Sequence, residues 1–240
     1  MRHAGHVSSA PRGLHGALIH DLGRKIANGA HPAGVALSLD ALCAQYQASK
    51  PTVREALRVL ESKGLLKIRQ SLGTRVQPVD QWNLLDADVV AWRLEGGDRA
   101  QQVRELLQMR LAVEPVAAGL AAQVHDPSVV ARLEAALSAM RTAADNGDLR
   151  AFTKADVEFH ATLLSSCGNR MFPLLTVLVA TALEAREQAL TQHHVDLSVA
   201  ALEQHGAVIA AIDRGDPDSA EEQMRAMLRA LQHEETSAQQ

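Results

Sequence analysis

Residues 49–60 read Ser-Lys-Pro-Thr-Val-Arg-Glu-Ala-Leu-Arg-Val-Leu, and this segment constrains the fold more than any other. The spacing predicts a short helix, capped by Ser49, with Pro51 in its first turn. Its apolar stripe, suited to packing, consists of Val53, Ala56, Leu57 and Leu60. Its opposite ridge carries cations at every fourth position, which are Lys50, Arg54 and Arg58. Such a helix suits the major groove of DNA, although an ordinary solvated surface helix can have the same pattern.

The flanking segments favour the DNA-binding interpretation. Residues 14–29 predict a helix that ends at Asn28-Gly29, and residues 39–46 predict a second helix capped by Ser38. Short strand-like runs at 65–69 and 74–76 follow the cationic helix and flank a turn at 71–73. This order predicts a winged helix-turn-helix, whose wing tip would reach the adjacent minor groove or phosphates. The predicted DNA-binding residues are Ser49, Lys50, Thr52, Arg54, Arg58, Arg69, Gly73 and Arg75.

The charge distribution leads to the same expectation. Residues 1–78 carry 11 Lys and Arg against 4 Asp and Glu, whereas the remaining residues carry 13 against 24. The overall charge of −4 therefore combines a basic N-terminal part with an acidic C-terminal part. The basic part suits contact with phosphates, and DNA would repel the acidic part.

The rest of the chain predicts helices. Helical patterns cover about 82–94, 98–124, 127–145, 148–167, 170–191, 196–213 and 216–236, separated by Gly and Asx-Pro breaks. The expected fold is mainly α: a disordered arm at 1–13, a winged helix-turn-helix at 14–78, a linker and joining helix at 79–97, and an all-α bundle of six or seven helices at 98–240. Because no signal core or membrane-length apolar run is present, we expect a cytoplasmic protein without membrane contact.

Three polar residues within the predicted bundle could hold a metal. Asp156 and His160 are four residues apart on one helix, and His205 lies among apolar residues on another. A carboxylate and two imidazoles can hold a divalent metal with open coordination positions. Hydrogen-bonded core or surface residues would give the same spacing. A metal-dependent hydrolase would also use such a site, but only Glu158 is close enough to serve as its base, and it lies on a different side of the helix.

Residues 14–78 resemble the DNA-binding domain of GntR-type bacterial regulators. The matching segments are Gly29, Gly34, 49–57, 60–65 and Gly73-Thr74. The family usually has Arg in place of Lys50, and because Lys cannot form the bidentate fork of Arg on guanine, the operator sequence does not follow from the resemblance. The resemblance implies a homodimer that binds a palindromic operator in double-stranded DNA.

The body resembles the FCD effector domain of the FadR-type branch of these regulators. The matching segments are 110–115, Ala121-Ala122, Asp156-x-x-Phe159-His160, Gly168-Asn169, 203–212 and 220–224. The resemblance implies that Asp156, His160 and His205 bind a divalent metal, with Zn, Ni or Mn as candidates. The usual fourth ligand, a His, is replaced by Met227.

Residues 81–92 resemble the linker helix of D-galactonate-responsive repressors in the same branch. This implies a repressor of a sugar-acid operon, released from DNA by a small carboxylate effector that the metal also holds. The implied effector-binding residues are Arg110 and Asn169, although Arg110 could equally form a structural ion pair with Glu114. The alternative within the family is a structural metal with a different organic-acid or acyl effector.

Overall fold

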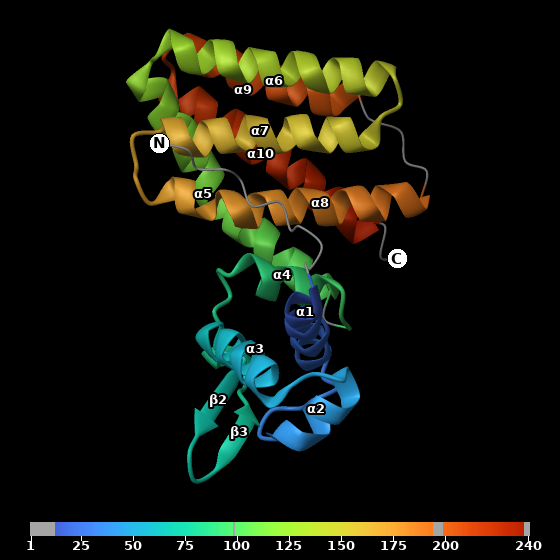
Figure 1. Cartoon of the computed structure of the whole chain (residues 1–240). Coiled ribbons are helices and arrows are strands. Elements are labelled where there is room, and N and C mark those ends of the chain that lie inside the picture. The colour runs from blue at the N-terminus through green and yellow to red at the C-terminus, as the bar shows by residue number, and fades with distance from the viewer. Residues whose placement is uncertain (1–12, 98, 194–198, 238–240) are drawn as a thin grey trace. The chain divides into compact units, whose positions relative to one another are not determined.

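The computed structural model describes residues 13–97, 99–193 and 199–237, with side chains omitted at 189–193 and 233–237. The chain divides into two compact units, Met1–Gln102 and Val103–Gln240 (Figure 1). The predicted disordered arm at 1–13 lies, except for residue 13, outside the described residues.

The first unit is built around three helices, α1 (Gly13–Ala27), α2 (Leu39–Tyr46) and α3 (Lys50–Ser62). The predicted apolar stripe of α3 is buried, and it packs in the same core as Leu18, Leu22 and Ile26 of α1. Ser49 is the N-cap of α3, and its hydroxyl accepts a hydrogen bond from the backbone N–H of Thr52 (3.4 Å). The amphipathic pattern alone therefore located this helix and its buried face correctly.

The wing is a sheet of three antiparallel strands in the order β1–β3–β2, namely β1 (Ala36–Leu37), β3 (Gly73–Val76) and β2 (Leu66–Arg69). The two predicted strands are confirmed within one residue, with Arg69 opposite Gly73 at the tip. The third strand, β1, was not predicted, because two residues are too few to show an alternating pattern. Gly73 has φ +72°, the left-handed region that a tight turn beside the tip requires.

The joining segment differs from the prediction of one helix from Trp82 to Leu94. A 3₁₀ turn, η1 (Val79–Gln81), is followed by a short helix, α4 (Ala87–Leu94), which begins at the N-cap Asp86. Leu85, which one continuous helix would place on the same face as Val89, is exposed. The prediction failed because the Asp86 carboxylate accepts hydrogen bonds from the backbone of residues 88 and 89, which starts the helix later.

Helix α4 forms part of the core of the first unit. Trp92 is buried, and its indole N–H donates to His20 Nδ1 on α1 at 2.9 Å. A Cβ atom at Gly23 would collide with the Trp92 ring, so only Gly allows α1 and α4 to approach this closely. Lys63, at the end of α3, pairs with Asp86 (2.8 Å) and Asp88 (2.9 Å). The end of the cationic helix and the start of α4 are therefore held together.

The second unit is an all-α bundle, as predicted. Its helices are α5 (Arg99–Val124), which begins in the first unit, α6 (Pro127–Asp145), α7 (Leu149–Ser166), η2 (Phe172–Leu175), α8 (Thr176–His193), α9 (Val199–Asp213) and α10 (Pro217–Ser237). Within the bundle α7 packs between α6 and α8, and α9 packs against both α6 and α10 (Figure 1). Pro127 and Pro217 occupy first helical positions, where the missing N–H costs no hydrogen bond.

The core of this bundle is rich in Ala and Leu, and it includes Phe159 and Leu163 of α7 with Met224 and Leu228 of α10. Among the described residues no helix is long and apolar enough to cross a membrane.

Candidate functional site

The cationic ridge of α3 lies on the solvent side of the helix, as predicted. Lys50, Arg54 and Arg58 are exposed, while the stripe on the opposite face is buried. Two of the three cations have nearby carboxylates, because Lys50 pairs with Asp40 (2.8 Å) and Arg58 with Glu55 (2.9 Å). Such exposed pairs are weak, so these cations can exchange their partners for phosphates.

The start of the same helix carries the two predicted hydroxyl groups. The Oγ atoms of Ser49 and Thr52 lie 2.8 Å apart, so one hydroxyl donates to the other. Ser49 is exposed and Thr52 is half-buried, beside the exposed end of the ridge.

The wing presents a second cationic surface. Arg69 and Arg75 are exposed, and Arg75 Nη1 donates to the backbone carbonyl of Gly34 (2.8 Å). Both arginines line a shallow depression of about 120 Å³ together with Gly73 and Lys67. Lys67 was missing from the predicted residues, although it lies two positions before Arg69 in a predicted strand and therefore on the same face of that strand.

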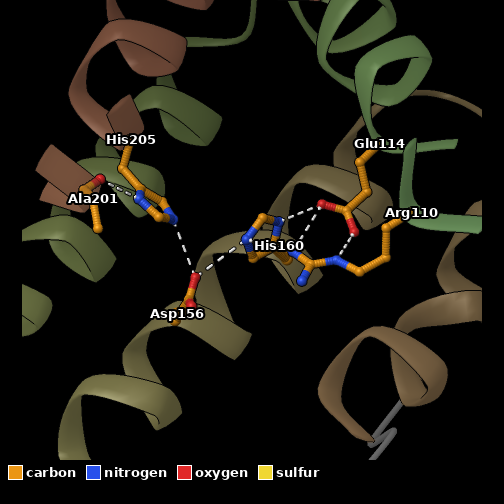
Figure 2. A network of polar contacts seen from close by, with 6 residues as sticks. All are labelled: Arg110, Glu114, Asp156, His160, Ala201 and His205. Carbon is orange, nitrogen blue, oxygen red and sulfur yellow. Dashed lines mark hydrogen bonds and ion pairs between the residues drawn. The ribbon is translucent and has the colours of Figure 1, made fainter. Parts of the chain in front are cut away.

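In the second unit five buried polar side chains form one network (Figure 2). They come from three helices: Arg110 and Glu114 from α5, Asp156 and His160 from α7, and His205 from α9. The i, i+4 spacing places each α5 and α7 pair on one helix face. All five are at most 5% exposed. The three predicted metal ligands are therefore brought together, and Arg110 lies beside them.

Asp156 lies between the two imidazoles. Its Oδ1 is 3.2 Å from His160 Nε2 and 3.1 Å from His205 Nε2. On the far side of its ring, His205 Nδ1 is 2.7 Å from the carbonyl oxygen of Ala201, which can only accept. The Asp156 carboxylate at Nε2 also only accepts, so a neutral ring can donate to only one of the two oxygens, and a metal bound at Nε2 would require the proton to be on Nδ1.

The ring of His160 is oriented in the same way. Its Nδ1 is 2.6 Å from Glu114 Oε2, while Arg110 Nη2 is 3.1 Å from its Nε2. Because a guanidinium can only donate, the Nε2 atom is the acceptor in that contact. The Nδ1 contact has the distance of an ion pair, but the ring N–H and the oxygen are not aligned as in a good hydrogen bond.

The electrostatics of the network favour an added positive charge. Burial would raise the pKa of Glu114, but Arg110 and His160 outweigh it and lower the pKa to about 2. The imidazoles likewise hold the pKa of Asp156 well below its usual range, although burial opposes them. Burial would lower the pKa of His160, but the carboxylate of Glu114, with Asp156, raises it to about 8. In the absence of a metal, His160 therefore binds an added proton between the carboxylates of Glu114 and Asp156.

The three predicted ligands fit a divalent metal. One oxygen of Asp156 and one nitrogen from each of His160 and His205 lie within 4.8 Å of one another. A divalent cation would replace the added proton of His160, and both imidazoles, then neutral, would bind it with one nitrogen each beside the carboxylate. A modest closing of the side chains would bring the three atoms to about 2.0–2.2 Å from a common centre. Met227 is buried in the apolar core, where a thioether is a poor ligand for such an ion.

The two predicted effector-binding residues lie in different places. Arg110 lines a small cavity of about 20 Å³, together with Arg186, Ala182 and apolar side chains of α5 and α10. This volume suits about one water molecule, so a larger ligand would require side chains to move. Asn169 lies in the turn after α7, where its Oδ1 accepts from the backbone N–H of Met171 (2.9 Å). It takes no part in the network, and its role in effector binding stays a prediction.

Sequence reasoning noted Glu114 only as a partner of Arg110 and missed its contact with His160. The ion pair itself is present, with Arg110 Nε 2.6 Å from Glu114 Oε1.

Glu158, considered above as the base of a hydrolase, is exposed and therefore does not face the buried network.

A winged helix-turn-helix with exposed cations, followed by a helical bundle with a buried polar site, defines the chain as a DNA-binding regulator with a ligand-binding domain. Residues 14–76 match the bacterial regulatory proteins of the gntR family, and residues 105–230 match the FCD domain. The chain belongs to this family of transcription regulators. Its members are not enzymes, which removes the hydrolase alternative.

Individual proteins agree with this assignment. The chain is 31% identical over 212 residues to the galactonate operon transcriptional repressor of Escherichia coli K12, covering 88% of this chain and 92% of that protein. It is 29% identical over 201 residues to a probable D-xylose utilization operon transcriptional repressor of Paenarthrobacter nicotinovorans, covering 82% and 77%. Among solved structures, Escherichia coli McbR/YncC has the same fold, with a TM-score of 0.56 and 18% identity over 95% of this chain and 99% of that chain.

Proposed function

We propose that the protein is a homodimeric repressor of a sugar-acid catabolic operon, which an aldonate such as galactonate releases from its operator. The observation that carries this proposal is the buried network in which Asp156, His160 and His205 adjoin the guanidinium of Arg110. A polyhydroxy carboxylate is the class of ligand that fits such a site, because its oxygens are suited to a metal and its carboxylate to an arginine.

The similarity to the galactonate and D-xylose repressors supports a sugar-derived effector and a repressing role. In this proposal Asp156, His160 and His205 hold Zn, Ni or Mn, and the bound ion acts as a Lewis acid toward the effector oxygens. Arg110 forms a salt bridge with the effector carboxylate, for which the guanidinium must give up part of its contact with Glu114. The apolar alternative, an acyl effector, is disfavoured because all five side chains in the network are ionisable groups at positions with almost no solvent.

The proposed contacts with DNA are made by α3 and the wing. The exposed ridge of α3 enters the major groove, with Ser49 and Thr52 at its start, and the residues around Gly73 contact the neighbouring backbone or minor groove. Because one such head reads only a few base pairs, two copies on a palindromic operator are needed for adequate affinity and specificity.

A thermal-shift screen tests the effector assignment. Protein loaded with Zn²⁺ or Ni²⁺ is heated with a panel of aldonates, simple hydroxy acids and fatty acids. By mass action a ligand at about 100 times its Kd adds roughly 2.7 kcal/mol to the stability of the folded state, and the melting temperature rises accordingly. A shift with fatty acids alone would contradict the proposal.

A further inference from the structure

We propose that Glu114 is the positioning residue of the effector domain: its one carboxylate sets the orientation of the His160 ring and holds the Arg110 guanidinium beside it. This inference rests on the proposed metal and effector site. Glu114 binds neither the metal nor the effector, but it orients two residues that do.

The burial of Glu114 requires an explanation. Its side chain is 0% exposed, and a charged carboxylate is costly to bury unless cations or N–H groups compensate it. Both of its oxygens have partners, since Oε1 is 2.6 Å from Arg110 Nε and Oε2 is 2.6 Å from His160 Nδ1. Glu114 therefore connects Arg110, the proposed partner of the effector carboxylate, directly to His160, a proposed metal ligand.

Two contacts of His160 bear on which nitrogen carries the proton. Glu114 Oε2 lies 2.6 Å from Nδ1, at the distance of an ion pair, and Arg110 Nη2 lies 3.1 Å from Nε2, where it can only donate. Both contacts favour a neutral ring with its proton on Nδ1 and its lone pair on Nε2, the form that a metal at Nε2 requires, and they act against Asp156 Oδ1, which lies 3.2 Å from Nε2 and can only accept. Histidine ligands of metals are commonly fixed in this way by a carboxylate or carbonyl behind the ring. His205 has the backbone carbonyl of Ala201 in the corresponding place (2.7 Å), so both rings are oriented before a ligand arrives (Figure 2).

The charge count indicates a second task for Glu114. With neutral histidines, the network comprises the cation Arg110 and the anions Glu114 and Asp156, which leaves one net negative charge. A divalent ion changes this to one net positive charge, and a ligand with a single carboxylate then neutralises the buried cluster. Without Glu114 the guanidinium would be uncompensated and would repel a metal at His160 Nε2. Glu114 therefore offsets part of the positive charge that Arg110 and a bound metal place in the cluster, which favours binding of the metal.

The test uses the full-length protein with Glu114→Gln, which keeps the shape of the side chain but removes its charge. Calorimetric titration of this variant with Ni²⁺ should show a metal affinity roughly 10- to 100-fold lower than that of the wild type. Glu203→Gln, which removes the same charge from an exposed position on the helix that carries His205, is the matched control and should leave the affinity unchanged. Wild-type affinity in folded Glu114→Gln would overturn the proposal.

Glu114→Gln leaves Arg110 buried without its anion and can therefore fail to fold. In that case the comparison is made in the Arg110→Met background, where the ion pair is already absent. Arg110→Met/Glu114→Gln should bind Ni²⁺ more weakly than Arg110→Met alone, because the orienting contact with His160 is lost. Equal affinities of these two folded variants would overturn the proposal.

A spectroscopic measurement separates this inference from the proposed metal site. ¹H–¹⁵N correlation spectra of the imidazoles in metal-free protein, recorded at about pH 9 where an ordinary histidine is neutral, identify the protonated nitrogen. His160 should carry its proton on Nδ1 in the wild type and lose this preference in Glu114→Gln or the double variant. A wild type that binds no metal but shows this difference refutes the metal site and supports the positioning role. The same His160 signals with and without Glu114 would refute the positioning role.

Discussion

His205 Nε2 lies 3.1 Å from Asp156 Oδ1, although the two residues are 49 positions apart and belong to different helices. Both side chains are almost fully buried, and Asp156 is also 3.2 Å from His160 Nε2. Because a carboxylate at this depth is stabilised only by its polar partners, the packing of α7 against α9 and the polar site depend on each other.

His160 provides the most direct test of the metal site by substitution. His160→Ala should abolish stoichiometric metal binding, measured by elemental analysis after dialysis, because it removes one of three ligands and the others are too few to hold the ion. Operator binding should survive, since the first unit has a separate core. His15→Ala, at an exposed position of α1, controls for metal bound loosely by surface histidines. A His160→Ala protein that retains one tightly bound metal would place the ion elsewhere.

Arg110 allows metal binding and effector binding to be separated. In the proposed arrangement Arg110→Met leaves the three metal ligands in place, so metal content should stay near the wild-type value while effector affinity falls at least tenfold, a cost of roughly 1.4 kcal/mol or more. Calorimetric titration of the loaded variant with an aldonate measures this. If Arg110→Met instead unfolds the second unit, Arg110 serves mainly as the structural partner of Glu114.

The exposed cations of α3 are expected to provide much of the DNA affinity. Arg54→Ala and Arg58→Ala should each weaken operator binding by roughly 1–3 kcal/mol, because each removes a contact with a base or phosphate. Gel-shift titration at a fixed salt concentration measures the loss. Arg141→Ala, which removes an exposed arginine of α6, should bind DNA like the wild type. Wild-type affinity in both α3 variants would contradict the assignment of the recognition helix.

Asp21 makes the stability of the first unit depend on pH. Burial would raise the pKa of Asp21, but hydrogen bonds from Lys25, Tyr46 and Arg24 outweigh this effect and hold its pKa below the ordinary value of 3.8. A carboxyl whose pKa is lower in the folded state stabilises the fold above its ordinary pKa, and the contribution is lost as the pH falls through the lower, folded-state value. Asp21→Asn should therefore cost on the order of 1 kcal/mol at neutral pH and progressively less in acid.

Urea unfolding followed by tryptophan fluorescence measures this effect in the first unit, because Trp82 and Trp92 are the two tryptophans of the chain. Asp80→Asn, at an exposed position of the same unit, is the control. A stability loss in Asp21→Asn that is as large in acid as at neutral pH would point to packing rather than charge.

The proposed homodimer has a simple test. Light scattering at micromolar concentration should give about twice the chain mass of 25.8 kDa, because a palindromic operator requires two heads. A mass of one chain, both free and with DNA, would contradict the proposal.

Much of the fold could be predicted because its signals are local. The buried stripe of α3, the caps at Ser38 and Ser49, and the Asp-Pro helix starts depend on residues within one or two turns. The boundaries of the joining segment could not be predicted in this way. Trp82 and Trp92 fit one helical period, but Asp86 caps a shorter helix, and the packing of Trp92 on Gly23 depends on a helix 69 residues earlier in the chain.

The site was predictable to a similar degree. The Asp156 and His160 pair followed from helical spacing, whereas the convergence of His205 depended on resemblance, because no local rule sets how two helices pack. The link between Glu114 and His160 was missed for the same reason. Neither residue's neighbours in sequence indicate that a carboxylate from α5 would lie behind the ring of a histidine on α7.

The most direct test of the proposed function is release of DNA by an effector in the presence and absence of metal. A fluorescent DNA duplex, selected by its binding to the protein, is followed by anisotropy while D-galactonate and related aldonates are added. At least one aldonate should release the DNA from Zn²⁺- or Ni²⁺-loaded protein, and removal of the metal by a chelator should abolish the release, while DNA binding itself persists. Equal release from loaded and stripped protein, or no release by any aldonate, would contradict it.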